Sequence, residues 1–364
     1  MNDYSTIASA LSELNDCVET TERNLSRTRR ARRAAWKTPT FTNSWVNFGA
    51  SPTYELAGYA LDNDGYVHLK GLIKTGATAT SAFTLPVGYR PVRDMQVAIA
   101  ASGGLAYVLI GADGTVKPTN STSSAVATYA SLSGVSFRVR EGEGEVPLGT
   151  HDTTYEHYPL STSQPATARV DLSGIVNLSG VVKWTTAPAA TNNNIFRVRQ
   201  DLGTHWRMNF PAYSSGTTNG LTRIDVAHDV FSYVVGVSPT NYMVLNGIKW
   251  PSPDLLLTSF STATLSAGAT PYTSVPTYPT VLRVVKDMMG RCWIGGIVNT
   301  TNNANGNSIA VLPSGYRPTS RIIMTGMSNN AYTPINVYSD GTVTFNATGA
   351  SPVIINHCFW LDNG

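Results

Sequence analysis

The hydrophobic pattern divides the chain into a short N-terminal segment and a much longer remainder. Near the N-terminus, apolar residues recur at alternating spacings of four and three, which is the a and d pattern of a coiled coil. Thr21 and Thr28 weaken the second half of this pattern. A helix this short is marginal alone, so we expect self-association, and a helix docked on its own chain is the alternative. The predicted contact residues are Ile7, Leu11, Leu14, Val18 and Leu25.

After Trp36 the pattern changes to period two with frequent turn signals, and three repeats appear. "DNDGYVHLKGLI" begins at Asp62, "DLSGIVNLSGVV" at Asp171 and "DMMGRCWIGGIV" at Asp287. Each repeat has Asp and Gly at the spacing of a tight turn, where Gly supplies a positive φ and Asp caps the turn. "IGADGTV", "RIDVAHDV" and "VYSDGTV" follow at similar distances.

Three units of similar length, each composed of short strands, predict a mainly β protein. We expect an α-helical coiled-coil segment followed by three tandem antiparallel β-domains of sandwich or jelly-roll type. The predicted boundaries are 1–36 for a stem with a basic end, 37–140, 141–251 with a linker at its start, and 252–364 for a distal tip.

A second motif, Leu-Pro-x-Gly-Tyr-Arg-Pro, occurs at Leu85 and again at Leu312. Two prolines around a Gly cannot join a central strand, so the motif predicts a rigid corner between strands. Its Arg is free to stack on the neighbouring Tyr or to bond loop carbonyls. A ligand site is the alternative, although the middle unit lacks the motif.

"WVNFG", "GYVHLKGLIKTG", "FTLPVGYRP", "DGTV" and "LSGVSF" occur in this order. This ordered set resembles a β-domain of bacteriophage tail fibres and minor tail proteins, especially in phages of Gram-positive bacteria. The resemblance covers residues 45–139 well, residues 290–359 moderately and the middle unit only by its frame. It implies a trimeric, virion-attached protein used in host recognition, without catalytic residues.

The strand that follows each Asp-x-x-Gly turn has apolar residues on both of its faces. Leu72, Val181 and Ile297 occupy the face that should be polar if solvent covered it. They are either isolated surface hydrophobes or contacts with a neighbouring subunit of a homotrimer, and we favour the second.

Composition and charge narrow the function classes. Charged residues make up 13% of the chain, about half the usual share, and no secretory signal is visible. These features fit a virion protein assembled in the host cytoplasm and released by lysis. The basic residues cluster in one run, which predicts a polar collar at the end of the stem or an anchor to tail or baseplate proteins; nucleic-acid binding is the alternative. The run contains Arg27, Arg29, Arg30, Arg32 and Arg33.

No catalytic motif, cofactor site, metal site or membrane insertion is predicted. "DNDG" at Asp62 lacks the rest of a calcium loop, and "THDTTYEHY" at Thr150 is interpreted as a solvated linker rather than an axial metal site. Paired carboxylates for glycan cleavage remain an alternative. Cys292 and Cys358 are expected to be buried thiols.

Host binding is predicted at loops of the third unit, because recognition usually lies on loops at the free end of a rigid scaffold. The ligand would be a cell-wall glycan, and Trp293 would serve either as a sugar platform or as an interface plug. A purely structural fibre and a polysaccharide-degrading spike are the competing functions. The candidate residues are Asn302, Asn303, Asn305, Asn329, Asn330, Tyr332 and Trp293.

Overall fold

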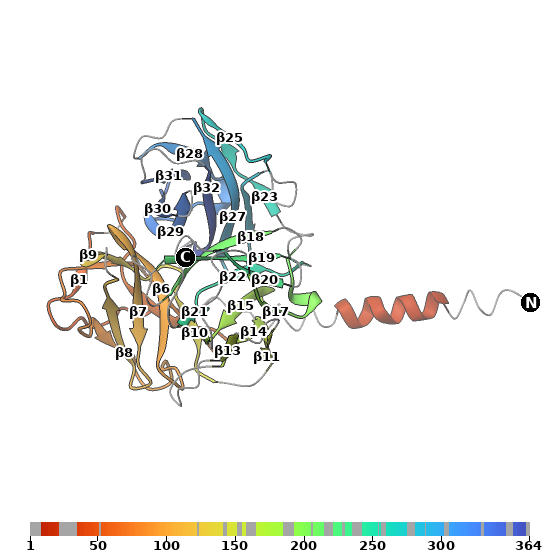
Figure 1. The fold of residues 1–364 in the computed structure, drawn as a ribbon, viewed down its shortest axis with the longest axis horizontal. Coiled ribbons are helices and arrows are strands. Elements are labelled where there is room, and N and C mark those ends of the chain that lie inside the picture. The colour runs from red at the N-terminus through yellow and green to blue at the C-terminus, as the bar shows by residue number, and fades with distance from the viewer. Residues whose placement is uncertain are drawn as a thin grey trace, which may run out of the picture.

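The protein is mainly β, with one short N-terminal helix and several antiparallel sheets (Figure 1). The computed structural model describes residues 9–21, 35–50, 52–121, 124–140, 144–150, 155–157, 165–184, 193–204, 207–214, 221–227, 230–234, 242–253, 255, 260–274, 281–287, 289–301, 306–328, 331–346 and 352–361. The predicted mainly β, antiparallel class is confirmed.

The described part of the helix, residues 9–21, is exposed along its whole length. The apolar side chains on it face solvent: Leu11 and Leu14 are each 61% exposed and Val18 is 46% exposed. Ile7, Leu25 and the arginine run at 27–33 lie outside the described residues. Within the described residues, no surface covers the apolar stripe of this helix.

Strand pairing in the body stays within three residue ranges, which we call unit one (37–140), unit two (141–251) and unit three (252–364), apart from one isolated bridge between Tyr54 and Arg321. Unit one contains a seven-stranded sheet and a three-stranded sheet. Its strands are β1 (Val46–Asn47), β2 (Gly58–Leu61), β3 (Tyr66–Lys70), β4 (Leu72–Lys74), β5 (Phe83–Thr84), β6 (Met95–Ser102), β7 (Gly104–Ile110), β8 (Thr115–Thr119), β9 (Ala125–Ser131) and β10 (Ser136–Arg138).

Unit two contains sheets of four, five and three strands. Its elements are β11 (Val146–Pro147), β12 (Gly149–Thr150), β13 (Tyr155–His157), β14 (Thr167–Val170), β15 (Ile175–Ser179), β16 (Val181–Trp184), β17 (Asn193–Arg197), η1 (Gln200–Leu202), β18 (Met208–Tyr213), β19 (Leu221–Ala227), β20 (Val230–Val234), β21 (Tyr242–Val244) and β22 (Lys249–Pro251).

Unit three forms one large sheet that curls into a nearly closed nine-stranded barrel, whereas a sandwich or jelly roll was expected. Its elements are β23 (Phe260–Thr262), β24 (Thr264–Leu265), β25 (Ala269–Pro271), β26 (Arg283–Lys286), β27 (Arg291–Thr300), β28 (Ser308–Val311), η2 (Ser314–Tyr316), β29 (Ile322–Ser328), β30 (Ala331–Val337), β31 (Thr342–Phe345) and β32 (Val353–Trp360).

The units also differ in the path of the chain at the glycine that closes each repeat. Gly71, Gly180 and Gly296 close the three repeats, and all have positive φ. A side chain at Gly71 would lie 2.4 Å from the backbone of Ala57, so only glycine allows that approach. The chain leaves its strand at Gly71 and at Gly180, which divides β3 from β4 and β15 from β16. In unit three, β27 continues through Gly296 and joins both halves of the sheet.

Each unit has a large cluster of buried apolar residues, but the clusters are not fully separate. Those of units one and three consist only of their own residues. The cluster of unit two also includes Val285, Trp293 and Cys358 from unit three. Units two and three therefore share part of one hydrophobic core.

Candidate functional site

The three Asp-x-x-Gly turns have the same hydrogen bonds. Asp62 Oδ1 accepts from the amides of residues 64 and 66, at 2.9 and 2.8 Å. Asp171 and Asp287 accept from the equivalent amides, at 2.8 to 3.0 Å. The glycine that ends each turn has a positive φ, between 78° and 90°. The predicted turn chemistry is confirmed, and "DNDG" is a hairpin turn of this type.

These turns start three strands, β3, β15 and β27, on which the repeats place equivalent side chains. His68, Asn177 and Trp293 occupy the same place in the three repeats, and all are buried. Their cross-strand partners are Ser136, Lys249 and Cys358, which are equally buried. We call these six side chains the hub.

Units one and two are joined at the hub by charged groups. Arg169 Nη2 donates to Asp64 Oδ1 at 2.7 Å, and the amide of Leu172 donates to the other oxygen of this carboxylate at 3.0 Å. Lys249 Nζ donates to the carbonyl of Gly134 at 2.7 Å and to the hydroxyl of Ser136 at 2.5 Å. Unit two therefore contributes two cations to acceptors on unit one.

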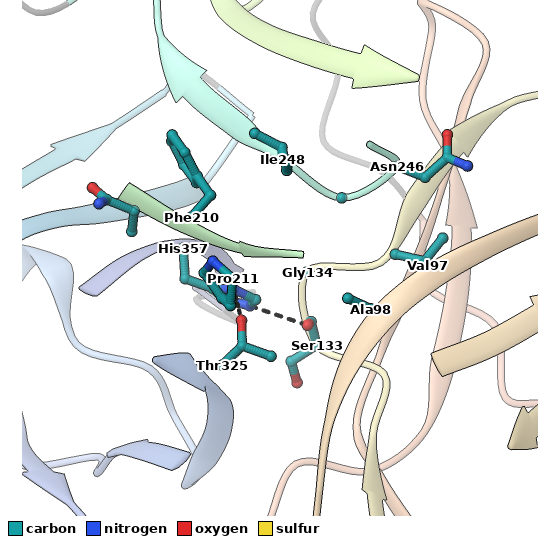
Figure 2. A pocket seen from close by; sticks show the side chains of 12 residues that line it. Val97, Ala98, Ser133, Gly134, Phe210, Pro211, Asn246, Ile248, Thr325 and His357 are labelled. Carbon is teal, nitrogen blue, oxygen red and sulfur yellow. Dashed lines mark hydrogen bonds between the residues drawn. The ribbon is translucent and has the colours of Figure 1, made fainter. Parts of the chain in front are cut away.

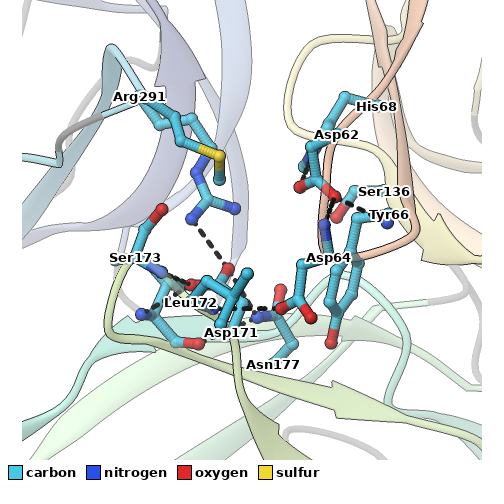
Figure 3. Close-up of polar contacts among 12 residues, drawn as sticks. Asp62, Asp64, Tyr66, His68, Ser136, Asp171, Leu172, Ser173, Asn177 and Arg291 are labelled. Carbon is cyan, nitrogen blue, oxygen red and sulfur yellow. Dashed lines mark hydrogen bonds and ion pairs between the residues drawn. The ribbon is translucent and has the colours of Figure 1, made fainter. Parts of the chain in front are cut away.

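Units two and three are joined by one buried arginine (Figure 3). Arg291 donates to Asp287 at 2.5 Å within its own turn and to Asp171 of unit two at 2.7 Å. The three side chains are each 4% exposed or less. Two carboxylates around one guanidinium keep its pKa well above the usual value despite burial. Arg291 therefore connects two of the repeated turns.

Units three and one also contact each other. The His357 ring nitrogen Nε2 lies 3.1 Å from the carbonyl of Ser133. The rings of His68 and Trp360 meet edge to face with centroids 4.9 Å apart. Because units one, two and three each contact the other two, the chain forms a closed arrangement of three units around the hub (Figure 1).

Burial decides the protonation of the central groups. Desolvation lowers the pKa of Lys249 to about 8 and that of His357 to about 4. It also lowers the pKa of His68, although the Asp62 carboxylate lies only 2.8 Å from Nε2 of that ring. Burial raises the pKa of the Cys358 thiol to about 11. At neutral pH these imidazoles and this thiol are uncharged, while Lys249 is mostly charged.

Asp62, His68, Ser136 and Lys249 are residue types used in acyl transfer, but their arrangement is structural. Ser136 accepts its hydrogen bond from Lys249, and Asp62 pairs with His68. All four side chains are buried. None of them lines the cavity described below. A reacting group must have access to its substrate, so the contacts favour a role in joining the units.

A small cavity lies where the three units meet (Figure 2). Its empty volume is about 380 Å³, including space open to solvent. Ser133 comes from unit one, Phe210 and Asn246 from unit two, and Thr325 and His357 from unit three. Thr325 Oγ1 lies 3.4 Å from Nδ1 of His357. Within the described part of the chain, no group of His, Cys, Asp and Glu residues has an arrangement that could hold a metal ion.

The two Leu-Pro-x-Gly-Tyr-Arg-Pro motifs form matching corners. In unit one Arg90 Nε donates to the carbonyl of Leu85, and in unit three Arg317 Nε donates to that of Leu312, both at 2.9 Å. Each arginine also lies against the glycine of the neighbouring Asp-Gly-Thr turn. The arginine bonds a loop carbonyl, which was one of the two predicted options.

Among the predicted trimer contacts, the three that lie on strands are buried within a single chain. Leu72 is 2% exposed and packs against Ala100 and against Ile323 of unit three. Ile297 is 3% exposed and contacts Met327 and Ile354 of its own unit. Val181 is 9% exposed. The neighbour that covers Leu72 is another unit of the same chain, so these residues provide no argument for a subunit interface.

Two predicted glycan-binding residues also lie at internal contacts. Trp293 is 2% exposed and belongs to the core shared by units two and three, so its ring packs inside the chain. Tyr332 packs with Tyr129 of unit one, and its hydroxyl donates to the carbonyl of Ala101 at 3.2 Å. This position does not fit the predicted glycan contact. Asn302, Asn303, Asn305, Asn329 and Asn330 lie outside the described residues.

Sequence reasoning missed the cations that join the units. Arg291 and Lys249 each interrupt an otherwise apolar repeat pattern, at positions where other units have Tyr66 and Ser136. A charged residue at a core position of a repeat was the available signal, because a buried charge requires a partner. Cys292 and Cys358 are buried free thiols, as predicted.

Comparison with known proteins adds no identification. No family model matches the chain, and no curated protein matches it. In the described residues no helix is long and apolar enough to cross a membrane. The function is therefore argued from the residues, their contacts and the motif order given above.

Proposed function

We propose that the chain is a virion attachment protein of the tail-fibre or minor-tail type. Its N-terminal stem would self-associate as a coiled coil and bind tail or baseplate proteins, and its β body would bind a glycan on the host cell surface. The observation that carries this proposal is the contrast between a helix with an uncovered apolar stripe and a body whose three units bury their repeated faces against each other.

The uncovered stripe supports self-association. Leu11, Leu14 and Val18 follow the 3-4 spacing of a coiled-coil seam and are all exposed in a single chain. An isolated helix of this length is marginal, so a second copy of the helix is the simplest covering surface. The number of three chains rests on the resemblance to tail fibres alone, because the repeated strand residues are already buried.

Light scattering on the full chain tests assembly. A trimer has about three times the 39.0 kDa chain mass, and Leu11→Lys with Leu14→Lys should reduce it to one chain mass without unfolding the body. Ser12→Lys with Thr20→Lys, which adds the same charge off the seam, is the matched control. A wild-type chain that stays monomeric at micromolar concentration would refute the stem assignment.

Cell binding tests the rest of the proposal. Fluorescently labelled protein should bind intact cells or isolated walls of some bacteria in a panel that includes Gram-positive species. A structural decoration fibre would bind none of them, and a polysaccharide-degrading spike would release soluble sugar from the walls. A nucleic-acid binder would instead show steeply salt-dependent binding to DNA that requires the arginine run.

A further inference from the structure

The hub pair of unit two brings together a primary amine and a carboxamide. Asn177 on β15 lies directly opposite Lys249 on β22, and both side chains are buried. The equivalent pairs of units one and three contain neither an amine nor an amide side chain. Of the three hub pairs, this one alone therefore combines an amine with an acyl group that the amine could attack.

The strand pairing holds these two residues close together. The amide of Leu178 donates to the carbonyl of Ile248 at 3.0 Å, so Leu178 and Ile248 form a hydrogen-bonded pair of the antiparallel ladder. The adjoining pair, Asn177 with Lys249, is then of the non-hydrogen-bonded type, in which the Cα atoms are about 4.5 Å apart and the side chains are closest. Lysine has a long, flexible stem. Its amine can therefore reach the Asn177 amide without movement of the backbone.

A carboxylate holds the nitrogen of the Asn177 amide (Figure 3). Nδ2 donates to Asp171 Oδ2 at 3.1 Å and to the carbonyl of Ile175 at 2.9 Å. The Oδ1 atom is buried and has no hydrogen-bond partner among the described residues. Buried polar atoms usually have one, so the carbonyl side of this amide is the side on which a new contact can form. Asp171 is placed at the nitrogen that would leave.

Lys249 is a better nucleophile than an ordinary lysine. Burial, the largest influence, and the nearby Arg291 lower its pKa to about 8, against the opposite effect of Cys358, Asp171 and Asp62. Roughly a tenth of the Lys249 side chains are then uncharged at pH 7, compared with fewer than about one in a thousand for an ordinary lysine. The uncharged amine is the form that attacks an acyl group.

From this arrangement we propose that Lys249 and Asn177 join in an isopeptide bond, an amide between Lys249 Nζ and Asn177 Cγ. Nζ now donates to the Gly134 carbonyl and the Ser136 hydroxyl, and rotation of the lysine stem would bring it to Cγ. The Nζ–Cγ bond forms, the Cγ–Nδ2 bond breaks, and the proton lost by Nζ passes through the Asp171 carboxylate to Nδ2, which leaves as ammonia. No oxidant or cofactor is needed.

The bond would tie together two strands that are far apart in sequence. Residues 178–248 would lie in a closed loop, so β15 and β22 would stay joined even in the unfolded chain. Such a constraint stabilises a fold by restricting its unfolded state. Because the acyl group belongs to the same chain, burial does not hinder this reaction as it would hinder one with an external substrate. The proposal is independent of the attachment function.

Mass spectrometry of the denatured full chain tests the bond, after purification and after prolonged incubation at about pH 8, where Lys249 is half uncharged. The wild type should be lighter than its sequence mass by one ammonia molecule. Lys249→Met and Asn177→Leu should each keep the full mass. Lys183→Met is the matched control and should still lose ammonia, because Lys183 lies on the next strand and pairs with Glu156.

Peptide mapping separates this bond from the other source of ammonia loss. An Asn-Gly sequence such as Asn246–Gly247 can also release ammonia, by closing a succinimide on its own backbone. The isopeptide bond instead prevents trypsin from cutting after Lys249 and joins the peptide that ends at Lys183 to the one that contains Lys249.

The wild type alone decides the proposal, even where a variant folds poorly. Ammonia loss together with the joined peptide in the wild type supports it. The full sequence mass at both times overturns it, and so does ammonia loss without the joined peptide. Ammonia loss that persists in Lys249→Met would place the reaction at another asparagine and would likewise overturn it.

Discussion

The two corners and the hub are both built from repeated positions, yet they behave differently. The corners of units one and three share the Leu-Pro-x-Gly-Tyr-Arg-Pro motif and the same 2.9 Å arginine-to-carbonyl bond. At the hub, the equivalent pairs are His68 with Ser136, Asn177 with Lys249, and Trp293 with Cys358. The side chains of the repeat are therefore conserved between units at the corners, whereas at the hub the same strand positions carry different side chains.

The surroundings explain the difference. A corner contacts mainly its own unit, namely the carbonyl of its own leucine and its own Asp-Gly-Thr turn. Because the surroundings of the arginine are the same in both units, the same residues form the same hydrogen bond there. Several hub residues contact another unit, and the neighbour differs: Lys249 bonds Ser136 of unit one, Trp293 packs in the core of unit two, and His68 contacts Trp360 of unit three. These positions therefore carry a charged side chain (Lys249), an amide (Asn177) or a large ring (Trp293), depending on the neighbouring surface.

The largest effect that separates the two regions is expected at Arg291. Arg291→Met would leave the buried carboxylates of Asp171 and Asp287 without a cation, which costs about 3–5 kcal/mol of unfolding free energy. Denaturant titration measures this loss. Arg199→Met, which removes an exposed pair with Asp201, should leave the unfolding free energy nearly unchanged. Equal effects of the two changes would show that Arg291 is not central to the contact.

Exchanging equivalent residues tests whether hub positions are interchangeable. Trp293→Asn gives unit three the residue of unit two, and it should cost about 3–5 kcal/mol because a large ring leaves a shared core. Val87→Ser makes the same kind of exchange at a corner, where unit three has Ser314, and should cost less than about 0.5 kcal/mol because Val87 is 82% exposed. Thermal and denaturant unfolding of both variants measures the contrast, and a mild Trp293→Asn would contradict it.

The contact of His357 with Ser133, between units three and one, should make stability depend on pH. Its folded pKa of about 4 lies below the ordinary 6.5, because burial and the nearby Lys249 disfavour the charged ring. Protons then bind the unfolded chain preferentially, so this contribution is complete above about pH 6.5 and is lost as the pH falls toward 4. Unfolding at pH 7.5 and 4.5 should differ by about 2 kcal/mol more in the wild type than in His357→Gln. Identical pH profiles of stability in the wild type and His357→Gln would show that His357 does not cause the pH dependence.

The smallest effects are expected at the two corners and should match each other. Arg90→Ala and Arg317→Ala each remove one half-buried hydrogen bond to a carbonyl, which costs about 1 kcal/mol. The two losses, measured by denaturant titration, should agree within about 0.5 kcal/mol. A clearly larger loss in one unit would show that its corner also supports a contact between units.

The local chemistry of the chain could be predicted from its sequence. Asp62, Asp171 and Asp287 cap their turns as their spacing indicates, and the corner prolines lie outside central strands. The period-two pattern predicts a mainly β chain, and the heptad spacing predicts the helix. These features depend on residues close together in sequence, so the pattern carries the information.

Only the tertiary structure decided what covers each apolar face. The repeat pattern indicates that the strand faces carrying Leu72 and Trp293 must pack against another surface, and a second chain could have provided it. The structure supplies the neighbour from the same chain, through contacts such as that of Arg291 with Asp171, which are 120 residues apart. Tyr332 was expected on a free loop, but in the structure its hydroxyl donates to the carbonyl of Ala101 in unit one. Hydrophobic burial has no direction, so a pattern shows that a face must be covered but does not identify the covering surface.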